Sequence, residues 1–244
     1  MASEIEFTKY KTKGAYHWQQ ISLHPTRSNA FVKARYKHCL ALLSEATGGL
    51  DDKKVLDLGC GDGVLSWLLW CEGAKSYGVD TSDLAIRLAK DTHERRGSDA
   101  EFRTISAYNS EYPDGFFHAV VSSDVIEHVR EPLLLLEEIR RVLVPGGAAV
   151  ISTPIRLTEQ PLDPMHAAEW FPDEYKQLVR QVFPDACFSY SHPVFWMEFF
   201  HRNKLNRALI NVMSAFFNPF VRNNWRFQAM QYALVKKRFE FEKP

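Results

Sequence analysis

Short apolar runs alternate with stretches of helical spacing through the middle of the chain. We predict buried strands where such runs are bounded by glycine, proline or acidic residues; they lie at residues 55–58, 76–80, 100–105, 116–123 and 148–154. A helix that is apolar nearly all round is predicted at residues 64–71, and amphipathic helices at residues 84–89 and 132–143. Strands that alternate with helices predict a parallel sheet covered by helices on both faces.

The last third of the chain predicts one more helix, two more strands and an insertion. The helix lies at residues 172–182 and the strands at residues 186–192 and 227–236. Between the strands, residues 195–226 carry apolar residues at the spacing of an amphipathic helix, namely Leu205, Leu209, Val212, Met213, Phe216 and Phe217. Basic residues lie near its start. This segment has three interpretations: a lid over an acceptor pocket, a peripheral membrane contact, or a helix packed on the core or on a second subunit.

The composition is that of an ordinary globular protein, with 45% hydrophobic and 25% charged residues. Lysine and arginine balance the acidic residues at 30 each, so no overall basic field favours nucleic acid. The four cysteines show no C-x-x-C pair, which argues against a disulfide framework or a thiolate zinc site. No signal-peptide core and no run of about 18 apolar residues occurs. We expect a cytoplasmic protein of one domain.

The sequence VLDLGCGDG at residues 55–63 predicts a strand, a glycine turn and the start of a helix. Backbone N–H groups and a helix N-terminus face a ligand in such a unit. The glycines follow G-x-G-x-G rather than the dinucleotide pattern, and Asp57 and Asp62 would repel a pyrophosphate but attract a cation. S-adenosylmethionine carries two positive charges and no phosphate. At this point the chain resembles the class I S-adenosylmethionine-dependent methyltransferases.

The resemblance covers about residues 54–154 and implies a doubly wound, Rossmann-like sheet of seven strands, mostly parallel, closed by an antiparallel C-terminal hairpin. It also implies cofactor contacts. Asp80 ends the second strand about 20 residues beyond the glycine turn, where an acid binds the ribose hydroxyls. The cofactor-binding residues that the resemblance implies are Asp57, Gly59, Cys60, Gly61, Gly63, Asp80, Thr81, Ser106, Ala107 and Ser123.

Two positions depart from the family pattern. Ser106 and Ala107 stand where many members carry an acid beside the adenine amino group, so a hydroxyl or a backbone group would make this contact. His118 stands where relatives usually carry an acid.

The sequence DVIEHV at residues 124–129 resembles the E-H-V motif of a subgroup that includes quinone, sugar and lipid O-methyltransferases. If a helix begins near Asp124, Glu127 and His128 share one of its faces. His166 follows the fifth strand and would reach the same sheet edge. The small-RNA 3′-end 2′-O-methyltransferases are similar here, which implies that Asp124, Glu127, His128 and His166 bind a divalent metal such as Mg, Mn or Zn.

Two other interpretations need no metal. His128 or His166 could act as a general base on a hydroxyl, since an imidazole titrates near neutral pH and Asp124 lies beside them. Alternatively, Glu127 and His128 only pack against the cofactor. We expect turnover after treatment with a chelator to separate these interpretations.

The leader, residues 1–50, predicts a helix that ends near Gly48. In the family that the chain resembles, such a leader often folds across the cleft as a cap, which makes Tyr16, His17, Trp18 and Arg27 candidate substrate residues; Trp170 is a further candidate. Packing of the large aromatic residues on the core is an equal alternative.

We therefore divide the chain into a cap (1–50), a cofactor-binding core (51–194), a helical lid (195–226), and a last strand with a tail (227–244). The expected activity is methyl transfer from S-adenosylmethionine to an oxygen of a small molecule, a sugar or a lipid-linked intermediate, by a monomer or a homodimer. A nucleic-acid-end 2′-O-methyltransferase, with a basic patch that includes Arg222 and Arg226, and a non-catalytic cofactor-binding protein are the alternatives.

Overall fold

A computed structural model describes residues 9–159, 161, 163–221 and 227–238. The ends of the predicted cap and tail, and Arg222 and Arg226 of the predicted basic patch, lie outside these residues. The strands are β1 Lys54–Leu58, β2 Lys75–Asp80, β3 Glu101–Thr104, β4 Phe117–Ser123, β5 Leu143–Pro154, β6 Cys187–Pro193 and β7 Gln228–Lys236. They form one seven-stranded sheet in the order β3-β2-β1-β4-β5-β7-β6.

The first five strands run parallel, and β7 pairs antiparallel with both β5 and β6. This is the predicted doubly wound fold with an antiparallel end. The order of the strands changes direction at β1: β2 and β3 follow on one side of β1, whereas β4 lies on its other side. In open α/β sheets, ligands bind beyond the carboxyl ends of the strands at such a switch point.

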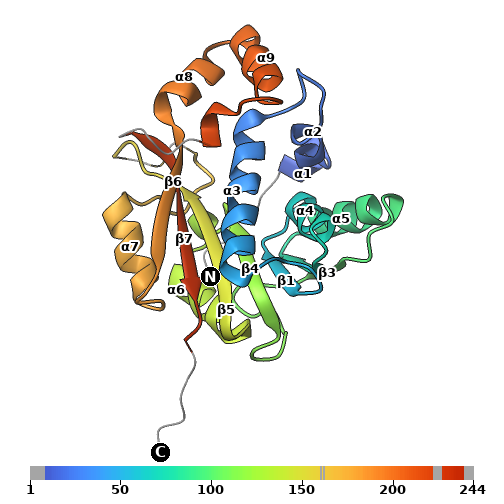
Figure 1. The fold of residues 1–244 in the computed structure, drawn as a ribbon, viewed down its shortest axis with the longest axis vertical. Helices are drawn as coiled ribbons and strands as arrows, with labels where there is room; N and C mark the ends of the chain where they lie inside the picture. Colours follow the sequence, from blue (N-terminus) through green and yellow to red (C-terminus); the bar gives the residue numbers. More distant parts are fainter. Residues whose placement is uncertain (1–8, 160, 162, 222–226, 239–244) are drawn as a thin grey trace, which may run out of the picture.

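Helices cover both faces of the sheet (Figure 1). The helices are α1 Lys9–Lys13, α2 Tyr16–Gln20, α3 Ala30–Thr47, α4 Val64–Cys71, α5 Asp83–Arg95, α6 Pro132–Val142, α7 Pro172–Arg180, α8 Val194–Arg202 and α9 Lys204–Met213, with 3-10 turns η1 Ile126–His128 and η2 Pro219–Val221. One apolar cluster joins α6 and α7 to the sheet, and a second joins α2, α3 and α4 to its other face. Residues 147–153 of β5 are all buried because both faces of the sheet are covered.

Three predicted elements differ in the structure. Strand β5 begins at Leu143 rather than at residue 148, because the sequence PGG at residues 145–147 forms an irregularity in its pairing with β4 and Gly146 takes a φ of 78°. No helix begins at Asp124; this residue has a φ of 55° and the short turn η1 follows it. The amphipathic helix predicted from Leu205 to Phe217 is α9, which already ends at Met213, and a further helix, α8, precedes it. Asn203 lies between the two helices and caps α9 with its side chain.

The inserted helices lie at the end of the molecule where α3 begins (Figure 1). Phe200, Ile210 and Phe220 pack on Ala30 and Ala34 of α3. The buried Asn211 of α9 adds three hydrogen bonds: its amide nitrogen donates to the carbonyl oxygens of residues 25 and 28, and its oxygen accepts from the N–H of residue 30. Helix α9 is thereby fixed to the loop before α3. None of the described helices is long and apolar enough to cross a membrane.

Candidate functional site

The glycine loop between β1 and α4 lies at the switch point of the sheet. Gly59, Gly61 and Gly63 have φ angles of 82°, 54° and 82°, in the left-handed region that favours glycine. A Cβ atom at Gly59 would overlap the side chain of Val125, so this position has no room for a larger residue. The N–H groups of Gly59 and Cys60 donate to the carbonyl of Val79 at 2.8 and 2.9 Å, which ties the loop to the end of β2.

Asp80 ends β2 beside this loop. Its Oδ2 accepts a hydrogen bond of 2.9 Å from the N–H of Gly61, and its Oδ1 accepts one of 2.8 Å from the N–H of Ser82. Burial raises the pKa of the carboxyl group, although these hydrogen bonds lower it. Asp80 is thus fixed at the carboxyl edge next to the loop, where the sequence predicts the ribose ligand.

The two acids that flank the loop have different surroundings. Asp57 is buried below the loop, where the Ser66 hydroxyl donates to its Oδ2 at 2.6 Å, and burial raises its pKa to about 7. Asp62 is also buried and accepts two hydrogen bonds of 3.0 Å from the backbone and the ring of His17. Asp57 therefore supports α4, and Asp62 anchors the leader, whereas the predicted contact of Asp57 with a cofactor stays a prediction.

The other predicted cofactor residues follow neighbouring strands. Thr81 follows β2 and is exposed, whereas Cys60 lies in the glycine loop, where it is buried and reduced. Ser106 follows β3, and its hydroxyl accepts a hydrogen bond from the N–H of Tyr108; Ala107 is half-buried there. Ser123 ends β4, where its hydroxyl accepts a hydrogen bond of 3.0 Å from Ser152. All of them lie along the carboxyl edge of the sheet, and their contacts with a cofactor stay a prediction.

The leader covers the glycine loop. Tyr10 of α1 is buried with its hydroxyl directly over Gly61, a contact that the sequence does not reveal. Trp18 donates from its indole N–H to the Asp62 carbonyl at 2.7 Å, and its ring packs against Trp67. Trp18 therefore packs on the core, as the alternative interpretation holds. The rings of Tyr16 and His17 lie 3.9 Å apart beside the loop, whereas Arg27 is exposed in the loop before α3.

Glu127, His128 and His166 form a cluster at the carboxyl end of β4. Each offers one potential ligand atom, and these three atoms lie within 4.8 Å of one another. Glu127 and His128 lie on the turn η1 rather than on a helix, and the N–H groups of residues 167 and 168 donate to the Glu127 carbonyl at 2.7 and 3.2 Å. These backbone hydrogen bonds hold the loop of His166 against η1.

Hydrogen bonds fix the orientation of both histidine rings. Nδ1 of His128 lies 3.0 Å from the carbonyl oxygen of Met165, so this nitrogen carries the proton in the neutral ring and Nε2 carries the lone pair. Nδ1 of His166 lies 2.5 Å from a carboxylate oxygen of Glu169, which favours the same tautomer. Burial lowers the pKa of His128, which favours its neutral form.

Glu127 is completely buried, and its two oxygens differ. Oε2 accepts a hydrogen bond of 3.0 Å from the Thr153 hydroxyl. Oε1 has no hydrogen-bond partner among the described residues. Burial and the nearby Asp124 raise the pKa of this carboxyl group well above its usual range. A buried carboxyl oxygen without a partner is costly, so this oxygen is available to a further group.

Asp124 lies outside this three-residue cluster. Its carboxylate forms an ion pair with Arg35 of α3, and its other oxygen accepts a hydrogen bond of 3.3 Å from the Ser152 hydroxyl. Its predicted role as a fourth ligand stays a prediction. The sequence gives one sign of this ion pair, a single arginine within the apolar stripe of α3.

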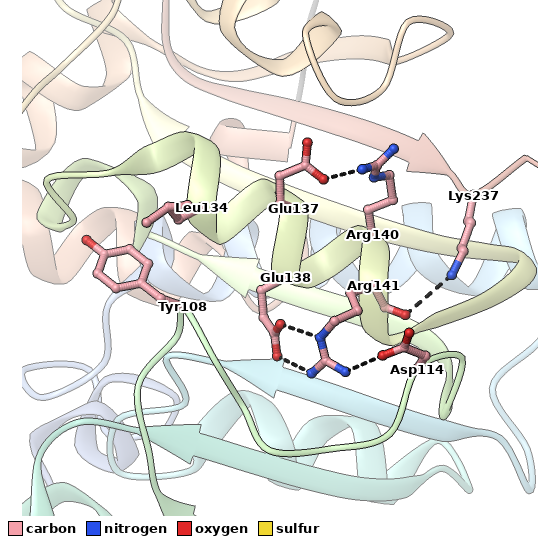
Figure 2. Close-up of a pocket in the computed structure, with 8 residues that line it drawn as sticks. All are labelled: Tyr108, Asp114, Leu134, Glu137, Glu138, Arg140, Arg141 and Lys237. Carbon is pink, nitrogen blue, oxygen red and sulfur yellow. Dashed lines mark hydrogen bonds and ion pairs between the residues drawn. The ribbon is translucent and has the colours of Figure 1, made fainter.

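Trp170 packs on the core between the cluster loop and α7, with its ring 6.2 Å from that of Tyr175. A hollow of about 450 Å³ lies elsewhere, along α6. Figure 2 shows that its charged residues pair with one another: Glu138 and Asp114 both bind Arg141, and Glu137 binds Arg140. No residue of the cluster or of the glycine loop lines this hollow, so it belongs to neither.

Residues 56–151 match the family model described as a methyltransferase domain. The ubiquinone biosynthesis O-methyltransferase of Nitrosomonas europaea is 32% identical over 156 residues, which are 62% of this chain and 63% of that protein. The chain thus spans less than two thirds of that relative's length. The protein of the same name from Acinetobacter baylyi is 24% identical over 90% of this chain and 88% of its own length.

A solved structure shows the same fold. Phosphoethanolamine N-methyltransferase 2 of Haemonchus contortus, in complex with phosphomonomethylethanolamine and S-adenosylhomocysteine, superimposes with a TM-score of 0.68 at 18% identity. The superposition covers 96% of this chain and 60% of that protein. The core of the chain, residues 56–151, is therefore similar to the methyltransferase domain family, and the whole chain shares its fold with a solved methyltransferase.

Proposed function

We propose that this chain transfers the methyl group of S-adenosylmethionine to a hydroxyl oxygen of a small-molecule acceptor. The carrying observation is the cluster of Glu127, His128 and His166 at the carboxyl end of β4, beside the glycine loop. A hydroxyl needs help to lose its proton before it attacks a methyl group, and this cluster is where such help is available. The names of the related O-methyltransferases support oxygen as the acceptor atom.

A divalent metal fits the cluster in three respects. Two imidazole nitrogens and one carboxylate oxygen are a donor set that Zn, Mn and related ions accept. Each histidine also donates its other ring N–H to a carbonyl or a carboxylate, the arrangement that orients metal-binding histidines. Oε1 of Glu127 is a buried oxygen without a partner among the described residues, and a cation would satisfy it.

Each residue of the cluster then has a defined task. Glu127, His128 and His166 would hold the ion, which would lower the pKa of a bound acceptor hydroxyl. Three protein ligands leave coordination positions for two acceptor oxygens, so we expect an acceptor with neighbouring hydroxyl groups, as in a catechol. If no metal binds, Nε2 of His128 carries the lone pair that a general base requires.

Positioning supplies the remaining part of the rate. The sulfonium is already a good leaving group, so the alignment of oxygen, methyl carbon and sulfur determines much of the barrier. Asp80 and the glycine loop would hold the ribose and the amino acid part of the cofactor. The leader lies over this loop through Tyr10 and His17, where it would exclude water from the cofactor.

The test uses radiolabelled S-adenosylmethionine with the metal-stripped protein and three acceptors: a catechol, a simple phenol and a 3′-terminal RNA oligonucleotide. We expect methylation of the catechol that requires added Mg²⁺ or Mn²⁺. His128→Ala should lower kcat by about 10²- to 10⁴-fold, the range for a lost acid–base or metal-assisted step. His118→Ala is the matched control, because His118 is an exposed histidine near the amino end of β4.

Each other result identifies a different function. Full activity in chelator excludes the metal, and its loss in His128→Ala then supports a general base. Methylation of the RNA alone contradicts a small-molecule acceptor. Cofactor binding without a methylated product from any acceptor would indicate a non-catalytic protein of this fold.

A further inference from the structure

Helix α9 is buried on one side and carries exposed apolar residues on the opposite side. One side is buried against the protein through Ile210 and the polar Asn211. The opposite side carries residues spaced by four, three and four positions, which places them in one stripe along the helix. The exposed fractions of these side chains are 77% for Leu205, 57% for Leu209, 52% for Val212 and 95% for Phe216, which lies just past the helix end. We call these four residues the outer stripe.

The outer stripe is unusual for a surface that faces only water. Single exposed apolar residues are common, but four large ones in a row mark an interaction surface. The helix is held in this orientation by contacts on its inner side, where Phe200, Ile210 and Phe220 pack on α3 and Asn211 binds the loop before α3. Rotation of α9 to bury the outer stripe would break these contacts and expose the inner side.

Basic residues lie next to the outer stripe, and the exposed Glu198 of α8 is the single acid in residues 195–217. Arg202 and Lys204 are exposed at the α8–α9 junction, at the same end of the helix as Leu205. Arg207 lies on the inner side, with its guanidinium over the Phe200 ring at 5.4 Å. Residues 199–217 contain no aspartate or glutamate. A helix with an apolar stripe beside basic residues is typical of helices that lie in the interface of an anionic bilayer.

We propose that α9 docks this protein on the surface of an anionic phospholipid bilayer. The outer stripe lies at the boundary between head groups and acyl chains, and Arg202 and Lys204 contact the lipid phosphates. A second copy of the chain fits this surface less well. A twofold contact would place the same predominantly basic segment against itself, with Glu198 as the single carboxylate in residues 195–217 to pair with Arg202 and Lys204.

The position of α9 gives this docking a use. Strand β6 leads into α8 at the end of the sheet where β4 and β5 also finish, so the inserted helices lie at the same end as the cluster of Glu127, His128 and His166 (Figure 1). A protein held by α9 would turn this end toward the bilayer. The docking itself does not depend on which acceptor is methylated.

Sedimentation with phospholipid vesicles tests the proposal on the whole chain. We expect binding to vesicles of phosphatidylcholine with phosphatidylglycerol, weaker binding to phosphatidylcholine alone, and a decrease at high salt. Burial of one leucine or phenylalanine changes partitioning by about tenfold or more, so Leu209→Ser with Phe216→Ser should weaken binding by on the order of a hundredfold. Arg202→Glu with Lys204→Glu should weaken it at least about tenfold.

The matched control is Leu133→Ser with Leu134→Ser on α6, where both leucines are also exposed. This control should bind vesicles like the wild type. Thermal unfolding and cofactor binding show whether each variant is folded. Equal binding to both kinds of vesicle, or binding that survives the double change on α9, overturns the proposal. A dimer in light scattering that the same double change dissociates would assign the outer stripe to a second copy and would also overturn it.

Discussion

The ion pair between Arg35 and Asp124 connects the leader helix α3 to the carboxyl end of β4, and its removal gives a quantitative test of this structure. The side chains are only 10% and 21% exposed. Arg35→Met removes the positive charge and leaves the Asp124 carboxylate with its Ser152 hydroxyl alone. Breaking a fully buried ion pair costs about 3–5 kcal/mol. Because Asp124 keeps some contact with water, we expect a loss of about 2–4 kcal/mol in the free energy of unfolding.

Two substitutions of Asp124 separate the stabilising effect of its charge from that of its backbone conformation. Its φ of 55° lies in the left-handed region, which asparagine and glycine tolerate better than other residues. Asp124→Asn removes only the charge, whereas Asp124→Ala removes the charge and adds about 1–2 kcal/mol of backbone strain. Asp124→Ala should therefore be the less stable of the two by about that amount.

Urea unfolding followed by circular dichroism measures these free energies. The double variant Arg35→Met with Asp124→Asn should lose less than the sum of the two single variants, by about 1–3 kcal/mol, because neither charge is left alone. Additive losses would refute the ion pair as described. Equal stability of Asp124→Asn and Asp124→Ala would refute the backbone argument.

Three further predictions follow from single positions. Burial lowers the pKa of His192 from 6.5 to about 3, so below pH 6.5 only the unfolded state takes up this proton. The free energy of unfolding should therefore decrease as the pH is lowered below 6.5, by up to about 1.4 kcal/mol per pH unit. Urea unfolding at several pH values should show a smaller pH dependence for His192→Asn. The raised pKa of Asp57 stabilises the folded state as the pH is lowered, which opposes the effect of His192. The contribution of His192 is therefore the difference in pH dependence between the wild type and His192→Asn. Gly61→Ala should weaken S-adenosylmethionine binding in calorimetry, because the added Cβ would overlap the hydroxyl of Tyr10 on α1. Gly97→Ala is the control for backbone strain, because Gly97 has a φ of 72° and open space around it. Mn²⁺ at about 100 times its Kd should stabilise the wild type by about 2.7 kcal/mol in thermal unfolding but should not stabilise Glu127→Ala, and equal stabilisation would contradict the metal site.

The sheet could be predicted from local patterns because buried strands and glycine turns are local features. The third strand, for example, was expected at residues 100–105 and lies at Glu101–Thr104. Strand β5 was predicted too short because a proline and two glycines normally end a strand. Here they stay within it, as an irregularity whose cost the pairing with β4 and β7 offsets.

The site depends more on contacts between distant residues. The motif at residues 124–129 and His166 are brought together, but the helix expected at Asp124 does not form. The partner that holds Asp124 is Arg35, 89 residues away, and no spacing rule predicts it. The period of α9 likewise predicts an amphipathic helix but not that its apolar stripe is exposed and its other side packs on the protein.

Asn211 has a consequence for how this chain can be recombined. Its single amide group binds three backbone positions before and at the start of α3, so the inserted segment and the leader are joined by a contact that spans more than 180 residues. A chimera that takes residues 195–226 from a relative without asparagine at this position would leave two carbonyl groups and one N–H group of the leader without these partners. Transplanting the inserted segment into another relative therefore requires the leader loop of the same donor.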